Sequence, residues 1–327
     1  MAEMVKKATR ESFGMALVEL AKENPDVVVL DADLAAATKT GTFKKEFPDR
    51  FIDCGIAECN MVGIAAGMAT CGKIPFAASF AMFSAGRAFE QVRNSVGYPK
   101  LNVKIAGSHA GISTGEDGAT HQCCEDIALL RTIPGMVVLN PRDHYEMIAA
   151  VKAAAEHHGP VYIRLGRLAV ESINNGDDYT FELGKGITLR DGKDITIVAT
   201  GLMVGEAVKA GKVLAEQGID ARVINIHTIK PLDKEAVLKA IQDTRRIITV
   251  EDHNIIGGLG SAVAEVMAEA GKGCAFTRLG IPDKFAPIGL HEDIMSILGI
   301  DSNGIINAVR EAMNKDFEED DNWEDDV

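Results

Sequence analysis

Short runs of β-branched and other apolar residues alternate, along most of the chain, with segments whose apolar residues recur three and four positions apart. The first pattern predicts strands and the second predicts amphipathic helices. In the first half the predicted strands are residues 27–33, 51–55, 74–80, 102–107, 136–140 and 161–166. Because these runs are continuously apolar, they are typical of a parallel sheet that is covered on both faces.

The pattern lapses into polar, glycine-containing sequence at residues 174–184 and then restarts. The second set of predicted strands is 194–201, 221–227, 246–252 and 276–282, with helices at about 203–216 and 257–271. We therefore predict an α/β protein with two doubly wound, mostly parallel sheets. The predicted domains are residues 1–173 and 184–315, followed by a tail at 316–327.

The net charge of −14 is concentrated at the carboxyl end. The segment "DFEEDDNWEDDV" holds eight acidic residues and no basic one, which leaves −6 for the rest of the chain. We expect this tail to be a solvated, disordered extension.

The sequence contains neither a basic stripe nor an aromatic stacking platform, so it does not indicate binding to nucleic acid. No run approaches the roughly 20 apolar residues that a membrane span needs.

The six cysteines form no Cys-x-x-Cys pair and stand among apolar or small residues. This usage predicts reduced, mostly buried thiols. The amino-terminal sequence "MAEMVKKATRESFG" lacks the apolar core of a signal peptide. We therefore expect a cytoplasmic protein.

Residues that can carry chemistry follow the predicted strands of the first domain. In open parallel sheets, ligands bind at the carboxyl ends of the strands. The candidates at these ends are Asp33, Glu58, Phe80, Phe83, His109, Arg164 and Arg167. Although each has an ordinary structural alternative, their common position predicts one site along one edge of the sheet.

Glu58 stands where a short apolar strand meets the Gly- and Ala-rich helix that contains "GIAAGMA". The small residues of this helix permit close approach of a flat ligand, which favours a site for a heteroaromatic cofactor. The alternatives are an acidic residue placed by the helix dipole and a helix that packs tightly against another backbone.

The loop "GEDGATHQ", residues 115–122, is the segment most typical of a binding site, because a long glycine-rich connection with two nearby histidines is costly without a function. The His, Asp and Cys residues in and next to this loop lack the spacing of a structural zinc site. Phe80 and Phe83 could stack on a pyrimidine ring, or they could be core aromatic residues.

These blocks resemble the transketolase family. The first domain resembles its pyrimidine-binding domain in "RFIDCGIAECNMVGIAAGMA", "PFAASFAMFSAGRAFEQVR", "GEDGATHQ" and "GPVYIRLGR". The second resembles the family's carboxyl-terminal domain in "VEDHNIIGGLGSAVAEV". The resemblance covers about residues 5–315.

The resemblance implies an enzyme that uses thiamin diphosphate to move a two-carbon ketol unit from a ketose phosphate to an aldose phosphate. It implies that Glu58 hydrogen-bonds the aminopyrimidine ring and helps to remove the thiazolium proton. By the same likeness, Phe80 and Phe83 form the pocket of the pyrimidine, and Asp33 is an acid on the cofactor side.

For the substrate, the resemblance implies that His109 and His121 contact sugar hydroxyls and assist proton transfer. Asp117 would read the hydroxyl next to the reacting carbon. Arg10 and Arg167 would bind the sugar phosphate, a task that suits guanidinium geometry.

Two departures from the family pattern change the expectation. Alanines 35–37 stand where the family usually has a serine that helps to hold the phosphate. The chain also begins where a full transketolase is half over and lacks the "GDG" segment for the metal and diphosphate. We therefore expect a split enzyme in which a separate amino-terminal subunit holds the diphosphate and Mg²⁺ or Ca²⁺. The expected assembly has two copies of each subunit, and this chain alone could form a homodimer.

Three alternatives stay open. A fragment of 1-deoxy-D-xylulose-5-phosphate synthase and the β subunit of a 2-oxoacid dehydrogenase share this two-domain layout. The two histidines and two arginines favour transketolase over both. The third alternative is a regulatory module without activity, since a fold does not by itself establish a function.

Overall fold

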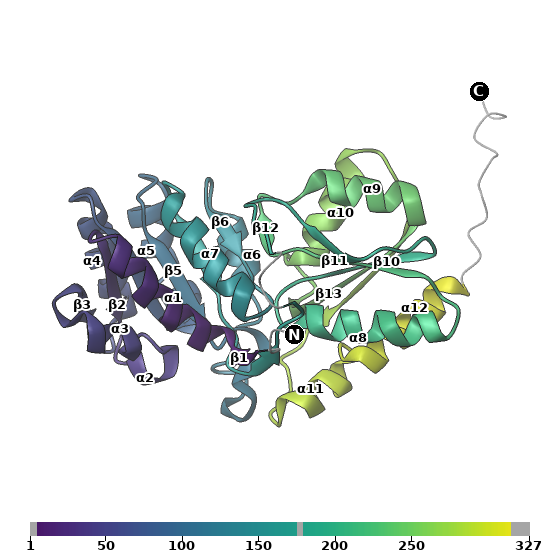
Figure 1. Cartoon of the computed structure of the whole chain (residues 1–327), viewed down its shortest axis with the longest axis horizontal. Coiled ribbons are helices and arrows are strands. Elements are labelled where there is room, and N and C mark those ends of the chain that lie inside the picture. The colour runs from purple at the N-terminus through teal and green to yellow at the C-terminus, as the bar shows by residue number, and fades with distance from the viewer. Residues whose placement is uncertain (1–4, 175–178, 315–327) are drawn as a thin grey trace.

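A computed structural model describes residues 5–174 and 179–314. It shows two α/β units that lie side by side along the longest axis of the molecule (Figure 1). One contains a seven-stranded sheet and the other a five-stranded sheet, and β1 (Lys6–Ala8) pairs with β8 (Ala169–Glu171) in a separate two-stranded sheet. The acidic tail expected to be disordered lies outside the described residues.

The seven-stranded sheet has the order β12-β6-β7-β5-β4-β2-β3, and its neighbours pair in parallel except for β12 with β6. Continuous burial of β2 and β5 agrees with the uninterrupted apolar runs in the sequence. The strands are β2 (Val27–Asp31), β3 (Phe51–Asp53), β4 (Ile74–Phe80), β5 (Lys104–Ser108), β6 (Val137–Leu139), β7 (Val161–Arg164) and β12 (Thr228–Lys230).

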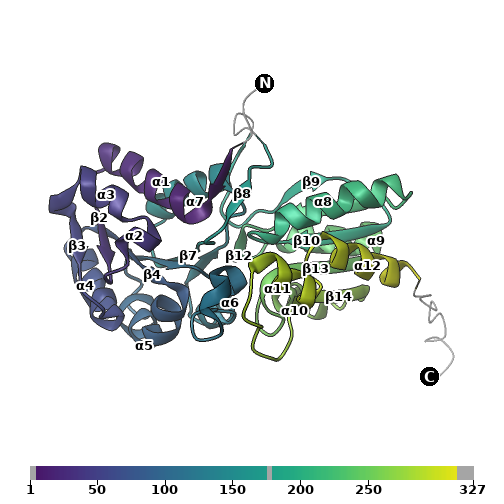
Figure 2. The same ribbon diagram turned by 90° about the horizontal axis from the view of Figure 1, so that it is seen from below.

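Helices cover both faces of this sheet. Figure 2 shows α1 and α7 on one side and α4, α5 and α6 on the other. The apolar stripe of α1, including Phe13 and Leu17, is fully buried against α7 and the sheet. The helices and shorter turns are α1 (Thr9–Glu23), α2 (Ala35–Thr38), α3 (Gly41–Glu46), η1 (Pro48–Arg50), α4 (Glu58–Thr70), η2 (Met82–Arg87), α5 (Phe89–Gln91), η3 (Val92–Gly97), η4 (Gly111–Asp117), α6 (Asp126–Arg131) and α7 (His144–Glu156).

The five-stranded sheet has the order β14-β13-β10-β11-β9 and is parallel except for β9. Its strands are β9 (Ile187–Arg190), β10 (Ile195–Ala199), β11 (Ala221–Asn225), β13 (Arg246–Asn254) and β14 (Ala275–Ile281). Its helices are α8 (Met203–Glu216), α9 (Lys234–Thr244), α10 (Leu259–Glu269), α11 (His291–Leu298) and α12 (Ser302–Met313). The predicted α/β class with two mostly parallel sheets is confirmed.

The division into two domains has an exception that the sequence did not show. Strand β12 follows β11 in the chain but pairs with β6 of the first sheet. The β1–β8 pair, by contrast, lies within the first domain and joins the amino-terminal segment to the segment after β7. Strands β1, β8 and β12 have only three residues each, so their pairing depends on tertiary contacts more than on local sequence.

All six cysteines are free, but the expectation that most are buried is wrong. Only Cys123 is fully buried, and Cys71 is exposed. Cys71 follows α4, where Gly63 and Gly67 face open space, so small neighbours here mark an outward face and not a core. Within residues 5–174 and 179–314, no helix has the length and apolar character needed to cross a bilayer.

Candidate functional site

Four aromatic side chains converge at the carboxyl ends of β4 and β5: Phe80 at the end of β4, Phe83 in the turn η2, and His109 and His121 from two loops. The rings of Phe80 and His109 stack with centroids 4.1 Å apart, and Phe80 and Phe83 lie parallel at 6.1 Å. The ring of His121 meets Phe83 edge-on at 5.4 Å and Phe80 at 6.3 Å. Four of the predicted site residues therefore lie together: Phe80, Phe83 and His109, which were placed at strand ends, and His121 from the loop 115–122.

His109 is the most buried member of this aromatic cluster, with 4% of its surface exposed. Its backbone is left-handed, with φ at 57°, and its Nδ1 lies 2.9 Å from the Ser108 hydroxyl. Burial lowers the pKa of His109 to about 3, and the positive charges of Arg10 and Arg167 add to this effect. The imidazole is therefore neutral at physiological pH.

We expect the NMR signals of the His109 ring to show no titration between pH 8 and pH 5, because a pKa lowered to about 3 keeps the ring neutral throughout that range. The His109→Gln variant would identify the signal. The unfolded chain in urea is the control, where the same ring should titrate near the reference pKa of about 6.5. A midpoint between pH 6 and 7 in the folded chain would contradict this electrostatic picture.

Residues of the second unit form hydrogen bonds with the loop of the first unit that carries His121. The backbone N–H of Asn254 donates to the carbonyl of Cys124 at 2.7 Å, and the Gln122 amide donates to the carbonyl of Pro287 at 3.1 Å. Gly111 has a φ of 62°, and a Cβ there would lie 2.3 Å from Asp252, so the loop approaches β13 closely. The geometry of the candidate site therefore depends on both units.

Glu58 begins α4 and is 2% exposed. Its carboxylate accepts a hydrogen bond from Nη1 of Arg87 at 2.8 Å. The Arg87 guanidinium also lies over the ring of Phe83, 4.5 Å from its centroid. We did not predict Arg87 as a partner of Glu58. The signal for it was its position at the end of the aromatic turn that contains Phe83.

The two cations of the predicted phosphate site lie together, and Asp117, predicted to contact a sugar hydroxyl, lies near one of them. Arg10 donates from Nε to the carbonyl of Arg167 at 3.2 Å and from Nη1 to the carbonyl of Ala37 at 2.7 Å. Nη1 of Arg167 donates to the carbonyl of Thr114 at 2.7 Å and lies 3.9 Å from the Asp117 carboxylate. One distant carboxylate does not neutralise two guanidinium groups, so the surroundings favour an anion.

Arg164 does not line the site, and this sequence expectation is wrong. Its guanidinium donates to Asp126 at 2.8 Å and forms a second ion pair with Asp252 on β13. The Tyr162 hydroxyl donates to Asp126 at 2.7 Å. All of these side chains are buried, so Arg164 connects the two units from inside.

Asp33 ends up at the predicted edge but outside the aromatic cluster. It follows β2 with a left-handed φ of 60° and is exposed. Its backbone N–H donates to the Asp53 carboxylate at 3.1 Å.

No group of three or more His, Cys, Asp or Glu side chains among the described residues could hold a metal ion.

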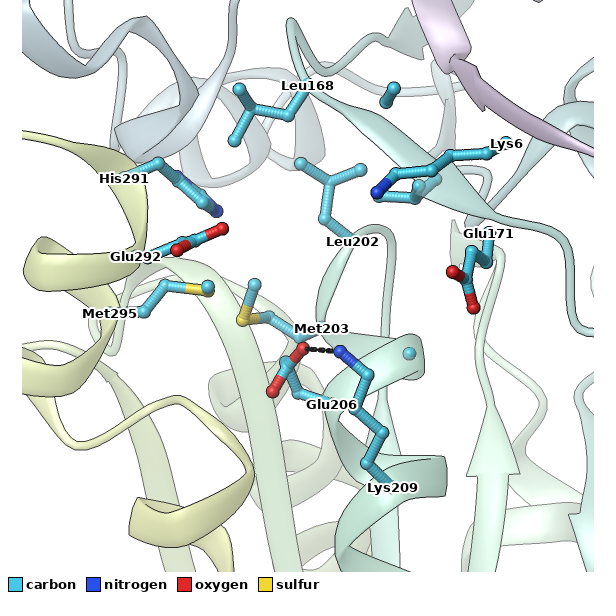
Figure 3. A pocket seen from close by; sticks show the side chains of 13 residues that line it. Lys6, Leu168, Glu171, Leu202, Met203, Glu206, Lys209, His291, Glu292 and Met295 are labelled. Carbon is cyan, nitrogen blue, oxygen red and sulfur yellow. Dashed lines mark hydrogen bonds and ion pairs between the residues drawn. The ribbon is translucent and has the colours of Figure 1, made fainter.

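A separate hollow of about 320 Å³ lies between β8, the start of α8 and α11 (Figure 3). Its charged side chains include Glu206 and Lys209, which form an ion pair at 2.7 Å. His291 lines it and also reaches the loop of the site, where Nδ1 lies 3.5 Å from the carbonyl of Ile112. None of the sequence-predicted site residues lines this hollow, so we place the candidate site at the aromatic cluster.

Comparison with known proteins identifies the family. Residues 5–172 match the model of the transketolase pyrimidine binding domain, and residues 184–305 match that of the transketolase C-terminal domain. The chain belongs to the transketolase family. The resemblance seen in the sequence blocks is thereby confirmed.

Relatives of the same length support this membership of the transketolase family. A protein of Methanocaldococcus jannaschii, provisionally named a transketolase C-terminal section, is 50% identical over 95% of this chain and 98% of its own length. A 6-deoxy-6-sulfo-D-fructose transketolase subunit of a Clostridium species is 44% identical over 93% of this chain and 94% of its own. A solved chain described as a split gene transketolase, an inactive beta4 tetramer, has a TM-score of 0.86 and 48% identity, covering 94% of this chain and 99% of its own. The chain is therefore a homologue of the carboxyl-terminal subunit of split transketolases.

Membership of the transketolase family implies thiamin diphosphate as the cofactor. The described residues fit its aminopyrimidine end. The planar guanidinium of Arg87 stacks on Phe83 and donates to the buried Glu58 carboxylate, and a flat heteroaromatic ring with a polar edge makes the same two kinds of contact. Arg87 is about half exposed, so its side chain can leave this place without disturbing the core.

Proposed function

We propose that this chain transfers a two-carbon ketol unit from a ketose phosphate to an aldose phosphate, together with a separate amino-terminal subunit. One observation carries the proposal: Glu58 with Phe83, the neutral His109 with His121, and Arg167 with Arg10 form three groups at one edge of the seven-stranded sheet. Glu58, Phe83, His109 and Arg167 follow strands of this sheet, whereas His121 and Arg10 reach the edge from a loop and from α1. The three groups provide, in order, contacts for a cofactor ring, for sugar hydroxyls and for a phosphate.

When bound, thiamin diphosphate supplies a carbon nucleophile and a place for the electron pair of the broken carbon–carbon bond. The part of Glu58 is to hold the pyrimidine ring through its carboxylate, at the first turn of α4. Phe83 offers a flat apolar face beside Arg87, the residue that bonds this carboxylate, and Phe80 lies parallel to Phe83. These contacts fix the orientation of the ring relative to the substrate.

The two histidines act on the sugar. Nδ1 of His109 is engaged with Ser108 and Nδ1 of His121 with Thr120, each at 2.9 Å, which leaves Nε2 of each ring for the substrate. A neutral imidazole can accept a proton from a hydroxyl group and return it, and the low pKa of His109 favours hydrogen bonding over full protonation. Asp117, which is exposed at the end of η4, can accept a hydrogen bond from a sugar hydroxyl.

The separate subunit is proposed to hold the diphosphate and its divalent metal. Support comes from the relatives of matching length, which are named as a section or a subunit of a transketolase.

Self-association of this chain is proposed through α4 and its surroundings. There Ile56 and Tyr98 are 76% and 86% exposed, and the outward face of α4 carries Gly63 and Gly67. Exposed apolar side chains of this size mark contact surfaces.

The test is reconstitution with the amino-terminal subunit, magnesium and thiamin diphosphate. We expect ketol transfer from xylulose 5-phosphate to ribose 5-phosphate by the mixture, and none by either subunit alone. The measurement is the appearance of the seven-carbon and three-carbon products. Full activity of this chain alone would refute the partner requirement. Condensation of pyruvate with glyceraldehyde 3-phosphate in place of ketol transfer would instead assign it to the synthase class.

A further inference from the structure

We propose that the hollow between β8, the start of α8 and α11 binds a linear zwitterion, a small molecule whose ammonium and carboxylate groups lie at opposite ends of an apolar chain. This is the hollow of about 320 Å³ that none of the predicted site residues lines. The inference concerns a second site, and it holds whether or not the chain transfers a ketol unit. The names of the relatives assign no role to this place in the fold.

The floor of the hollow is apolar and comes from both units. Leu168 stands just before β8, Leu202 and Met203 stand at the start of α8, and Met295 lies on α11. Leu202, Met203 and Met295 are each 9% exposed or less. Such side chains pack well against an alkyl chain, and the flexible methionine thioethers adapt to its shape. The volume also suits a small molecule.

Opposite walls of the hollow carry opposite charges. Figure 3 shows the side chains of His291 and Glu292 pointing into the hollow from α11. The side chain of Lys6 points into it from β1, on the other side of Leu202. Burial lowers the pKa of His291, so its ring adds a neutral polar edge beside the Glu292 carboxylate. One wall therefore suits an ammonium group, and the other suits a carboxylate.

The protein itself does not pair the charges of these two walls. Lys6 lies directly across from Glu171 in the β1–β8 pair, where opposite charges usually attract each other. Nevertheless, neither Lys6 nor Glu292 has a side-chain hydrogen bond or an ion pair with any residue that the structure describes. Glu206 and Lys209 also line the hollow, but they pair with each other at 2.7 Å. Two unpaired opposite charges across an apolar floor match a ligand with the complementary charges at its ends.

A ligand in this hollow would touch the segments that position the candidate site. Leu168 immediately follows Arg167, whose Nη1 donates to the carbonyl of Thr114 in η4 at 2.7 Å. From the other side, Nδ1 of His291 lies 3.5 Å from the carbonyl of Ile112, also in η4. A ligand bound to both walls therefore restrains both supports of η4, which makes the hollow an effector site.

Calorimetric titration of the full chain tests the ligand class. The probes are ω-amino acids of four, six and eight carbons and, for each length, the amine and the carboxylic acid that keep only one of the two charges. We expect the best zwitterion to bind with a Kd of about 0.1 to 1 mM, as for other ligands of this size. Its singly charged analogues should bind about 3- to 5-fold more weakly, the effect of one exposed ion pair. Zwitterions that bind no more tightly than these analogues, or do not bind, would overturn the proposal.

Two charge variants test the two ends of the ligand separately. Lys6→Gln should weaken the zwitterion and the carboxylic acid about 3- to 5-fold and leave the amine unchanged. Glu292→Gln should weaken the zwitterion and the amine by the same factor and leave the carboxylic acid unchanged. Lys212→Gln and Glu216→Gln change exposed charges farther along α8 and are the matched controls without an effect. The proposal fails if each of the first two variants weakens every probe equally, or if neither weakens any.

A variant that fills the hollow tests where the ligand binds. Gly205 of α8 lines the hollow, and a Cβ there would meet no atom within 4 Å. Because leucine favours a helix more than glycine does, Gly205→Leu should keep or raise Tm. Its side chain should nevertheless raise the Kd of the zwitterion about 10-fold or more, as overpacking does. Gly205→Ala adds one methyl group with a similar gain for the helix, so it should bind nearly as the wild type does. Undiminished binding by a stable Gly205→Leu would place the ligand elsewhere and overturn the proposal.

Hydrogen exchange measures the link between the hollow and η4. With the best zwitterion at about ten times its Kd, the amides of α11 and η4 should exchange about 10-fold more slowly than in the free chain. Helix α9, which does not line the hollow, is the internal control and should not change. Slower exchange confined to segments outside β8, α8, α11 and η4 would contradict the site. Unchanged exchange in η4 would overturn its link to the hollow.

Discussion

Replacement of Glu58 by glutamine should slow proton exchange at the thiazolium carbon of bound thiamin diphosphate by about 100-fold or more in the reconstituted enzyme. Glutamine keeps the size of the side chain but removes the carboxylate that is buried at the start of α4. A neutral amide cannot stabilise a proton on the pyrimidine ring as a carboxylate does, so the ring loses its activating partner. To measure the exchange rate, the reaction in deuterium oxide is quenched at set times, and NMR gives the remaining signal of the thiazolium proton.

The control for Glu58→Gln is Glu90→Gln, which changes an exposed carboxylate on the nearby α5. A second variant, Arg87→Gln, removes the guanidinium that lies between Glu58 and Phe83. Because Arg87 competes with the pyrimidine ring for these contacts, its removal should not slow exchange. An exchange rate in Glu58→Gln equal to that of the wild type would remove Glu58 from cofactor activation.

Replacement of Arg164 by methionine should lower the free energy of unfolding by about 3 to 5 kcal/mol, because it leaves two buried carboxylates without their cation. Burial works against the charge of Arg164, but Asp126 and Asp252 raise its pKa well above the usual value, so the guanidinium stays charged. The same side chain donates to the backbone carbonyl of Asp252 at 3.0 Å. Its loss therefore loosens the contact between the two units.

Urea unfolding monitored by circular dichroism measures the effect of Arg164→Met. Arg310→Met on the exposed face of α12 is the matched control and should change the free energy by less than about 0.5 kcal/mol. Adding Asp126→Asn and Asp252→Asn to Arg164→Met should recover part of the loss, since the unpaired charges are its cause. A loss below about 1 kcal/mol in the single variant would show that water reaches the carboxylates.

The sequence predicted the parallel strands well because most of them contain a continuous apolar run, as in β2 and β10. The predicted helix at 203–216 coincides with α8, whose amphipathic period is clear. Strands β1, β8, β9 and β12 were missed, since each has three or four residues and is determined by its partner in space.

The site was predictable to the extent that it follows strand ends. Phe80, His109 and Arg167 came after strands and do lie at the predicted edge. Arg164 was misplaced because it is the last residue of β7, where the face of the sheet on which a side chain lies depends on register, which a strand boundary does not fix. Arg87 had only the weak signal of its position at the end of the aromatic turn, because its contact with Glu58 arises from a π-helical turn that the sequence pattern did not predict.

Strand β12 limits how this chain can be divided. It belongs by sequence to the second unit, yet it covers the edge of the buried strand β6. A protein truncated between the two family matches would therefore leave Val137–Leu139 with unpaired amide and carbonyl groups along an apolar edge. Such an edge recruits other chains and leads to aggregation. We therefore expect the amino-terminal half to aggregate when it is separated from β12, so a division of the gene that keeps β6 and β12 in one polypeptide is favoured.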